Sequence, residues 1–300
     1  MNAASEPAAL LTLLRAGRGP WRRYAELVED AGSALAVLRQ EQKDPPDTAQ
    51  GVLFSEDEQP PAAQLLREAQ EDLHRWEREG IRVLTMLDSE YPVNLRLVHD
   101  RPPLIFLAGR LPAEDGRSVA VIGTRRPSPG GVKSAGVISG HLAALDYTVF
   151  SGLAAGIDTA AHRAALAGGG RTVAVIGTGL RRAYPPQNSA LQRRIADEGA
   201  VVSQFWPDAP PTRRSFPVRN ALMSGLTLAT VIVEAGERSG SRVQARAALA
   251  QGRPVFLLAP VLRHEWAREL AERPGVHVVR YPEEITTLLD RLHPAGALTA

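Results

Sequence analysis

Residues 118–124 read Ser-Val-Ala-Val-Ile-Gly-Thr, and residues 172–178 read Thr-Val-Ala-Val-Ile-Gly-Thr. Similar runs of Val, Ile, Leu and Phe, each ending in small residues or Pro, occur at 147–152, 229–236 and 254–260. Apolar runs without alternation are typical of strands buried on both faces, as in a parallel sheet covered by helices. Because stretches of helical composition separate them, the sequence predicts a doubly wound α/β domain whose ligands bind at the carboxyl ends of the strands.

The first 80 residues have a different pattern of apolar residues, which predicts a small all-helical domain. Apolar residues recur at helical spacing near 8–14, 21–28 and 65–76. A polar stretch with four prolines predicts a linker around residues 44–62. We expect domains at 1–80 and 81–300. The amphipathic stretch 285–292 predicts a last helix, packed on the core or on a dimer face, with the core preferred.

Composition excludes several classes of protein. The 300 residues contain no Cys, which rules out disulfide scaffolds, thiolate metal sites and a Cys nucleophile, and suits a reducing cytosol. The start of the chain lacks a basic stretch followed by an apolar core, and no apolar run approaches the ~18 residues of a membrane helix. We therefore expect a cytoplasmic protein that does not insert into membranes.

The net charge of +2 hides an asymmetry along the chain. Residues 1–115 hold 20 acidic and 13 basic residues, a charge of −7, whereas residues 116–300 hold 13 acidic and 22 basic residues, a charge of +9. A basic body suggests a polyanionic partner, and a solvated surface rich in Arg would give the same count. Charge alone does not separate the two.

The first strand-to-helix turn carries a candidate anion site. Gly123 permits a tight turn, the next helix should offer free N–H groups, and Arg125 and Arg126 add positive charge beside Thr124. The alternative is an ordinary loop. The turn is neither a dinucleotide fingerprint nor a P-loop, since the required glycines are missing.

The run Ser151-Gly152-Leu153-Ala154-Ala155-Gly156-Ile157-Asp158 is dense in small residues, which lets backbone approach a ligand closely. Asp158 and His162 stand four residues apart, on one face of a predicted helix. An acid–base pair is conceivable. A structural cap with a surface pair is the preferred interpretation, because no third partner is visible.

The segment 210–220 is the sharpest feature. It surrounds Phe216 with Arg213, Arg214 and Arg219 and ends in Asn220. Arg binds phosphate, Phe stacks on unpaired bases and Asn bonds a base edge or a phosphate, so this loop favours nucleic acid over a core role for Phe216. Ser239-Gly240-Ser241 opens a later helix and either cradles a phosphate or simply caps the helix. No catalytic, metal or cofactor constellation is recognisable.

Taken in order, these motifs resemble the DNA processing protein A family, also called Smf. The resemblance covers roughly residues 81–260. Its motifs are Asp88 with Tyr91-Pro92 and Leu95, Pro103-Leu104, Val121 to Arg125, Ser151 to Ala154, Gly156 to His162, Ala174 to Leu180, Tyr184-Pro185, Asn188, Phe216-Pro217-x-Arg219-Asn220, Val233-Glu234-Ala235 and Ser239 to Ser241.

This resemblance implies an extended Rossmann-like domain that binds single-stranded DNA without catalysis. It implies a role in natural transformation or recombination, where such proteins protect strands, help displace single-strand-binding protein, load the RecA recombinase and form homodimers. The family's phosphate turn matches Gly123-Thr124-Arg125 and its stacking aromatic matches Phe216. Arg213 matches a basic residue three positions before that Phe, and Ser239 to Ser241 matches a small-residue loop.

The sequence departs from the family pattern after Pro260. A Gly-x-Asn-x-Leu-Ile element is usual there, whereas this chain has His264-Glu265-Trp266. We expect no C-terminal winged helix. The N-terminal helices suggest a sterile-alpha-motif or helix-hairpin-helix type of module, or a protein-interaction module. The rival interpretation is a Rossmann-like nucleotide hydrolase of the phosphoribohydrolase kind.

Overall fold

The computed structural model describes residues 5–16, 19–43, 62–237 and 239–293. By its internal contacts the chain divides into two units, residues 1–91 with 100–105 and residues 92–99 with 106–300. The expected linker around 44–62 lies almost entirely outside the described residues. The expected domain boundary at residue 80 stays a prediction.

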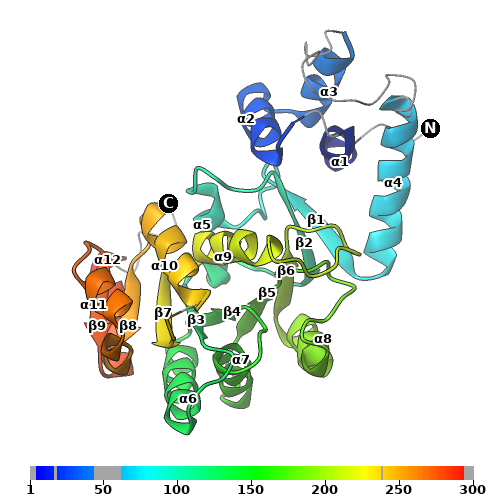
Figure 1. Ribbon diagram of the computed structural model, residues 1–300. Helices are drawn as coiled ribbons and strands as arrows, with labels where there is room; N and C mark the ends of the chain where they lie inside the picture. Colours follow the sequence, from blue (N-terminus) through cyan, green and yellow to red (C-terminus); the bar gives the residue numbers. More distant parts are fainter. Residues whose placement is uncertain (1–4, 17–18, 44–61, 238, 294–300) are drawn as a thin grey trace. The chain divides into compact units, whose positions relative to one another are not determined.

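The smaller unit is built from helices, as its apolar spacing predicts (Figure 1). Its elements are α1 (Glu6–Ala16), α2 (Trp21–Ala31), α3 (Ala34–Lys43), α4 (Ala62–Arg78) and β1 (Ile81–Thr85). Helix α1 contacts α3 and α4 and buries Leu10, Leu11 and Leu13. The carboxylate of Glu6 accepts from the amide of Ala34 at 2.6 Å and so caps the start of α3. Helix α1 is buried on all sides from Ala8 to Leu14, and this burial and the cap hold the unit together.

The larger unit is a doubly wound α/β fold, which confirms the expected fold class. Its strands are β2 (Leu104–Gly109), β3 (Ser118–Gly123), β4 (Thr148–Ser151), β5 (Thr172–Val175), β6 (Ala200–Ser203), β7 (Ala229–Glu234), β8 (Val255–Leu258) and β9 (Val276–Val279). Its helices are α5 (Val93–Arg96), α6 (Pro129–Ala144), α7 (Ile157–Ala167), α8 (Ser189–Glu198), α9 (Ser215–Leu226), α10 (Ser241–Ala250), α11 (Glu265–Ala271) and α12 (Pro282–Leu292).

The strands of this unit lie in the order β2-β6-β5-β4-β3-β7-β8-β9. The pairings from β6 to β9 are parallel, and β2 pairs antiparallel with β6. From β3 the chain winds outward through β4, β5 and β6, then returns to the other side of β3 with β7. The direction of winding therefore reverses between β3 and β7, the position where open α/β sheets bind ligands.

Helices cover both faces of the sheet. Helices α6, α7 and α8 contact β3 to β6 on one face, and α9 and α10 lie on the other (Figure 1). Strands β3, β4, β5 and β8 have almost fully buried side chains, as expected for runs without alternation. In α12, Ile285 and Leu289 are buried while Leu292 is half exposed, so this helix packs on the core through one face.

Candidate nucleic-acid interface

A pocket of about 520 Å³ lies at the carboxyl ends of β3 and β7, where the winding reverses. Its walls come from the β3–α6 and β7–α10 loops and from the starts of α7, α9 and α10. The lining residues are Ile122, Gly123, Thr124, Arg125, Arg126, Ala154, Asp158, Phe216, Arg219, Asn220, Met223, Gly236, Ser239, Gly240, Ser241 and Gln244. The pocket therefore gathers residues that lie more than a hundred positions apart in the sequence.

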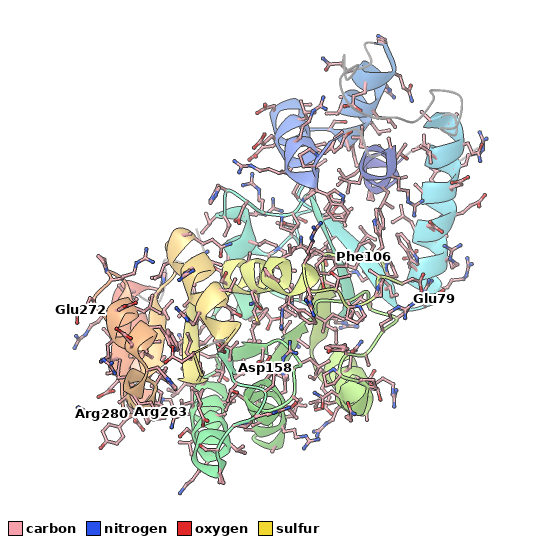
Figure 2. The ribbon with its side chains drawn as sticks, viewed as in Figure 1. Glu79, Phe106, Asp158, Arg263, Glu272 and Arg280 are labelled. Atoms are coloured by element: carbon pink, nitrogen blue, oxygen red, sulfur yellow. The ribbon has the colours of Figure 1, made fainter. Side chains whose placement is uncertain are left out.

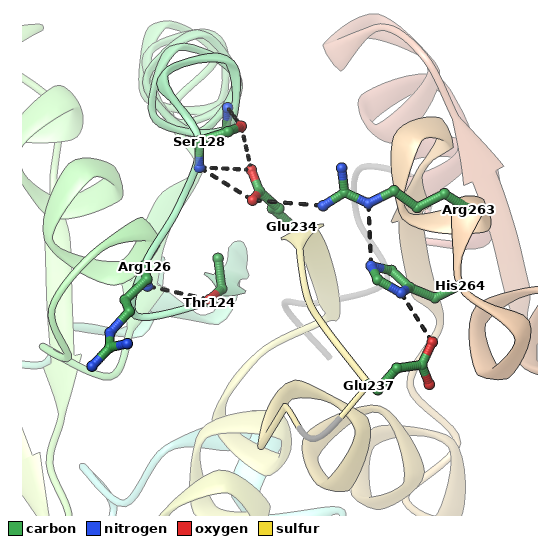
Figure 3. Close-up of polar contacts among 8 residues, drawn as sticks. Thr124, Arg126, Ser128, Glu234, Glu237, Arg263 and His264 are labelled. Atoms are coloured by element: carbon green, nitrogen blue, oxygen red, sulfur yellow. Dashed lines mark hydrogen bonds and ion pairs between the residues drawn. The ribbon is translucent and has the colours of Figure 1, made fainter.

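The β3–α6 loop turns tightly at Gly123, where the register between β3 and β7 shifts. A Cβ atom at Gly123 would lie 2.6 Å from Cγ1 of Ile157 and 2.7 Å from the carbonyl oxygen of Glu234, so only glycine fits. The amide of Arg126 donates to Oγ1 of Thr124 at 3.2 Å (Figure 3). This compact turn leaves the side chains of Arg125 and Arg126 exposed at the pocket.

The N-terminus of α6 is already occupied by a carboxylate, which corrects the expectation of free N–H groups there. Ser128 caps the helix by accepting from the amide of Gly131 at 3.0 Å. The amide of Ser128 donates to both oxygens of Glu234, at 3.1 and 3.2 Å, and its hydroxyl donates at 2.7 Å. The sequence did not indicate that Glu234, at the end of β7, would fill this position.

Phe216 is the second residue of α9 and is half-buried beside the β3–α6 loop. The guanidinium carbon of Arg125 lies 5.2 Å from its ring centre, and the ring of Tyr184 lies 5.7 Å away. On another side the ring approaches Gly177, where a Cβ would come within 3.1 Å of it. Phe216 is thus neither a deep core anchor nor a free side chain, but an aromatic ring in the pocket wall with a cation beside it.

Beneath this rim the pocket holds a buried pair of opposite charges, Arg219 and Asp158. The guanidinium of Arg219 is buried and donates to the carbonyl of Val175 at 3.1 Å. Burial lowers the pKa of Arg219, an effect that Asp158 opposes and Arg125 reinforces. Burial raises the pKa of Asp158, and the charge of Arg219 opposes that rise. The charge of each side chain therefore offsets part of the free-energy cost of burying the other.

Asp158 also ties the run of small residues to α7. Its carboxylate, on the second residue of α7, is buried and accepts from the amides of Gly152 at 3.1 Å and Ala154 at 3.4 Å (Figure 2). A Cβ atom at Gly152 would overlap the guanidinium of Arg219. The expected helix cap is not found, because no side chain caps the N-terminus of α7 and Asp158 accepts instead from amides of the segment that precedes the helix. The absence of a side chain at Gly152 leaves the space that Arg219 occupies.

Asp158 and His162 do not form a surface pair, because both are buried. Nδ1 of His162 shares a hydrogen bond of 2.7 Å with Oγ1 of Thr172. Burial, reinforced by the charge of Arg219, lowers the pKa of His162 to about 3. The imidazole is therefore neutral at physiological pH, and it does not line the pocket.

The β7–α10 loop supplies hydroxyl and backbone groups. Oγ of Ser239 accepts from the amide of Ser241 at 3.2 Å and donates to Oγ of Ser241 at 3.0 Å. The side-chain amide of Asn220 on α9 donates to the carbonyl of Gly240 at 3.4 Å. These bonds fasten the loop to α9 and keep small polar groups at the pocket.

Most of the residues expected to contact DNA meet in this pocket. They are Gly123, Thr124, Arg125, Arg126, Phe216, Arg219, Asn220, Ser239, Gly240 and Ser241. The four that do not line it are Ser151, Gly152, Arg213 and Arg214. Ser151 is buried and donates to the carbonyl of Val121 at 2.7 Å, whereas Arg213 and Arg214 are exposed just before α9.

Sequence reasoning missed several lining residues, and some carried a signal. Met223 follows Asn220 by three positions and Gln244 follows Ser241 by three, so each shares a helix face with an expected residue. Ile122, Ala154 and Gly236 adjoin the motifs without standing out as side chains. Asp158 was considered as a cap or as the partner of His162, because nothing in the sequence places it beside Arg219.

Two classes of feature are absent from the residues that the structure describes. These residues contain no group of three His, Asp or Glu side chains that could hold a metal ion. Among them, no helix is long and apolar enough to cross a membrane.

Comparisons with known proteins point to one family. The family model for DNA recombination-mediator protein A matches residues 82–287. The DNA processing protein DprA of Streptococcus pneumoniae is 41% identical over 174 residues, which cover 58% of this chain and 61% of that protein. Protein Smf of Escherichia coli is 38% identical over 214 residues, covering 70% of this chain and 57% of that protein. This chain therefore matches about three-fifths of the length of these relatives.

Solved structures agree with this assignment. The X-ray structure of DNA processing protein A from Streptococcus pneumoniae has a TM-score of 0.64 at 32% identity and covers 84% of this chain and 91% of that one. DNA processing protein A from Helicobacter pylori, described for its single-stranded DNA binding mode, has a TM-score of 0.62 at 29% identity, with 70% of this chain and 96% of that one covered. Because the family model matches well over half of the sequence, this chain belongs to the DNA recombination-mediator protein A family.

Proposed function

We propose that this protein binds single-stranded DNA in the pocket between β3 and β7 and delivers the strand to a RecA-type recombinase. The observation that carries the proposal is the pairing of Arg125 with Phe216 at the pocket rim, 5.2 Å apart. Single-stranded DNA offers a phosphate and an unstacked base at every nucleotide. A guanidinium beside an aromatic ring suits both of these groups.

The other pocket residues fit the same ligand. Arg126 is exposed and can neutralise a further phosphate, as can Arg213 and Arg214 on the neighbouring surface. The hydroxyls of Ser239 and Ser241 and the amide of Asn220 can hydrogen-bond phosphate or base-edge oxygens. The apolar side chains of Ile122 and Met223 offer contact area to a base. The positive charge of residues 116–300 attracts a strand of any sequence.

The arrangement supports binding rather than catalysis. His162 is buried, neutral and outside the pocket lining. Glu234 accepts hydrogen bonds from Ser128 and does not line the pocket. Among the described residues that line the pocket, the exposed arginines and the aromatic ring therefore fit a bound strand better than the hydrolase alternative.

The partners in this proposal follow from family membership. We infer that the protein acts in the cytoplasm as a homodimer, protects incoming or recombining strands, displaces single-strand-binding protein and loads RecA, in natural transformation or in recombination. The Helicobacter pylori relative is described for its single-stranded DNA binding mode, and this description supports the proposed binding of single-stranded DNA.

Fluorescence anisotropy with labelled single-stranded and duplex oligonucleotides, measured across a salt series, tests the proposal. We expect selective binding of the single strand, with a log–log salt slope of about −0.7 for each phosphate contacted. Equal affinity for both forms, or binding to neither, would contradict it. Release of free base from nucleoside monophosphates would instead support the hydrolase.

A further inference from the structure

Glu234 connects the two loops that form opposite walls of the pocket. Its backbone carbonyl accepts from the amide of Thr124 at 2.6 Å, at one end of the β3–α6 loop. Its carboxylate accepts from the amide and hydroxyl of Ser128, at the other end (Figure 3). One residue thus fastens both ends of the short loop that carries Arg125 and Arg126.

The carboxylate also occupies the place where an anion would bind to α6. A helix N-terminus carries partial positive charge, and nucleotide-binding folds of this type seat a phosphate there. Here the space is filled from within the protein, since a Cβ atom at Gly131 would overlap Oε2 of Glu234. The side chain of Glu234 is only 17% exposed.

A second carboxylate nearby provides a comparison. Glu237 lies three residues further on, in the β7–α10 loop, but its side chain is 60% exposed and its hydrogen bond is to Nδ1 of His264, at 3.0 Å. Nε2 of that imidazole accepts from Nε of Arg263 at 3.2 Å, and Nη2 of Arg263 lies 3.8 Å from Glu234 (Figure 3). Both carboxylates therefore share one chain of polar contacts, while only Glu234 reaches α6.

We propose that Glu234 is a positioning and specificity-determining residue of the DNA pocket. It fixes the Arg125–Arg126 loop against β7. It also prevents the phosphate of a free nucleotide from binding at the N-terminus of α6. The pocket then retains exposed guanidinium groups for a strand that can contact several of them at once. The positioning part of this inference rests on the proposed binding of single-stranded DNA.

A positioning role and simple electrostatics predict opposite changes in DNA affinity when this carboxylate is removed. Removing a negative charge near a polyanion should tighten binding through Coulomb attraction. Removing the group that orders Arg125 and Arg126 should weaken binding, because ordering that loop on the strand then costs entropy. The sign of the change in affinity therefore separates the two roles.

The experiment compares E234A, E234Q and the matched control E237Q in the full chain. With a labelled oligo-dT strand, we expect E237Q to bind within about twofold of the wild type or more tightly, and E234A to bind about tenfold more weakly. E234Q should recover part of the loss, since its amide oxygen can still accept from Ser128. If E234A does not fold, E234S takes its place in both measurements, because a serine side chain also leaves the position beside Gly131 open.

Thermal unfolding in orthophosphate and in chloride, at equal ionic strength, tests the anion position without DNA. At a phosphate concentration about ten times its dissociation constant, the midpoint of E234A should rise by about 3 °C. The midpoints of the wild type and E237Q should rise less, because phosphate acts on them only through the exposed arginines and through its general stabilisation of folded proteins. A general loss of packing would not create this phosphate dependence.

The inference is overturned if E234A binds the strand as tightly as the wild type, or if phosphate raises its unfolding midpoint no more than that of the wild type. Failure of the wild type to bind single-stranded DNA would instead refute the proposed function. In that case the phosphate measurement still decides whether Glu234 occupies an anion position.

Discussion

Arg125 and Phe216 lie 91 positions apart in the sequence, yet the guanidinium carbon of one is 5.2 Å from the ring centre of the other. The β3–α6 loop brings the cation and the start of α9 brings the ring. The two side chains lie side by side in the fold, so the groups that would take a phosphate and a base are close together. Such preorganisation lowers the entropy lost on binding.

Replacing Phe216 with Ala tests the stacking role. Stacking of a base on an aromatic side chain is worth about 1–3 kcal/mol, so affinity for single-stranded DNA should fall roughly 10- to 100-fold, while Phe216→Tyr should stay close to the wild type. Val218→Ala, at a half-exposed position on the same helix, is the control. Anisotropy titrations measure the effect, and a Phe216→Ala affinity within twofold of the wild type would exclude stacking.

Arginine substitutions can assign the bound phosphates one at a time. Arg125 lines the pocket, whereas Arg213 does not, although the family resemblance gives both a role. We expect Arg125→Ala to weaken binding more than Arg213→Ala. The double variant should weaken it further and reduce the salt slope by about 0.7 for each phosphate that is no longer neutralised.

Arg194→Ala is the matched control for these arginines, because that residue is exposed on α8 and pairs with Glu198 at 2.7 Å. Its salt slope should equal that of the wild type. A salt slope unchanged in the Arg125 and Arg213 double variant would show that the strand binds elsewhere.

Gly152 should be indispensable because of the space that Arg219 occupies. In Gly152→Ala the new methyl group overlaps the guanidinium, which is buried and bonded to Val175. Overpacking of this kind costs about 1–3 kcal/mol of the free energy of unfolding, and a displaced Arg219 should also weaken DNA binding.

Gly140→Ala in α6 provides the contrast, since no atom lies within 4 Å of the added Cβ. This change should leave stability unchanged or raise it by about 0.4–1 kcal/mol. Urea unfolding measures both variants. Equal midpoints for the two would contradict the assigned packing of Arg219 against Gly152.

The sequence predicted the strands that lead into the pocket because their apolar runs and terminal glycines are local signals. It did not predict β2 or β6, whose pairing is antiparallel and depends on partners distant in the chain. Arg219 was expected among the phosphate ligands, but whether an Arg is exposed or buried depends on the space beside Gly152. Glu234 was named in a family motif, but its contact with Ser128 was not predicted because the two residues are 106 positions apart. Periodicity and turn chemistry are local, whereas burial and charge pairing are set by tertiary contacts.

His162 should make the stability of the protein sensitive to acid. Its pKa is lowered from 6.5 to about 3 in the folded protein, so between these values the unfolded chain binds more protons than the native one. The free energy of unfolding therefore falls as the pH drops through this window, by about 2 kcal/mol between pH 8 and pH 5 for this group alone.

His162→Asn should flatten that pH dependence, because the Asn amide can keep the hydrogen bond to Thr172 but does not titrate. His74→Asn, at an exposed position on α4, is the control and should leave the pH dependence as it is in the wild type. Urea unfolding at pH 5 and pH 8 gives both differences. An equal loss of stability in wild type and His162→Asn would mean that the proton is taken up by other groups, and that the imidazole is not held neutral by its burial.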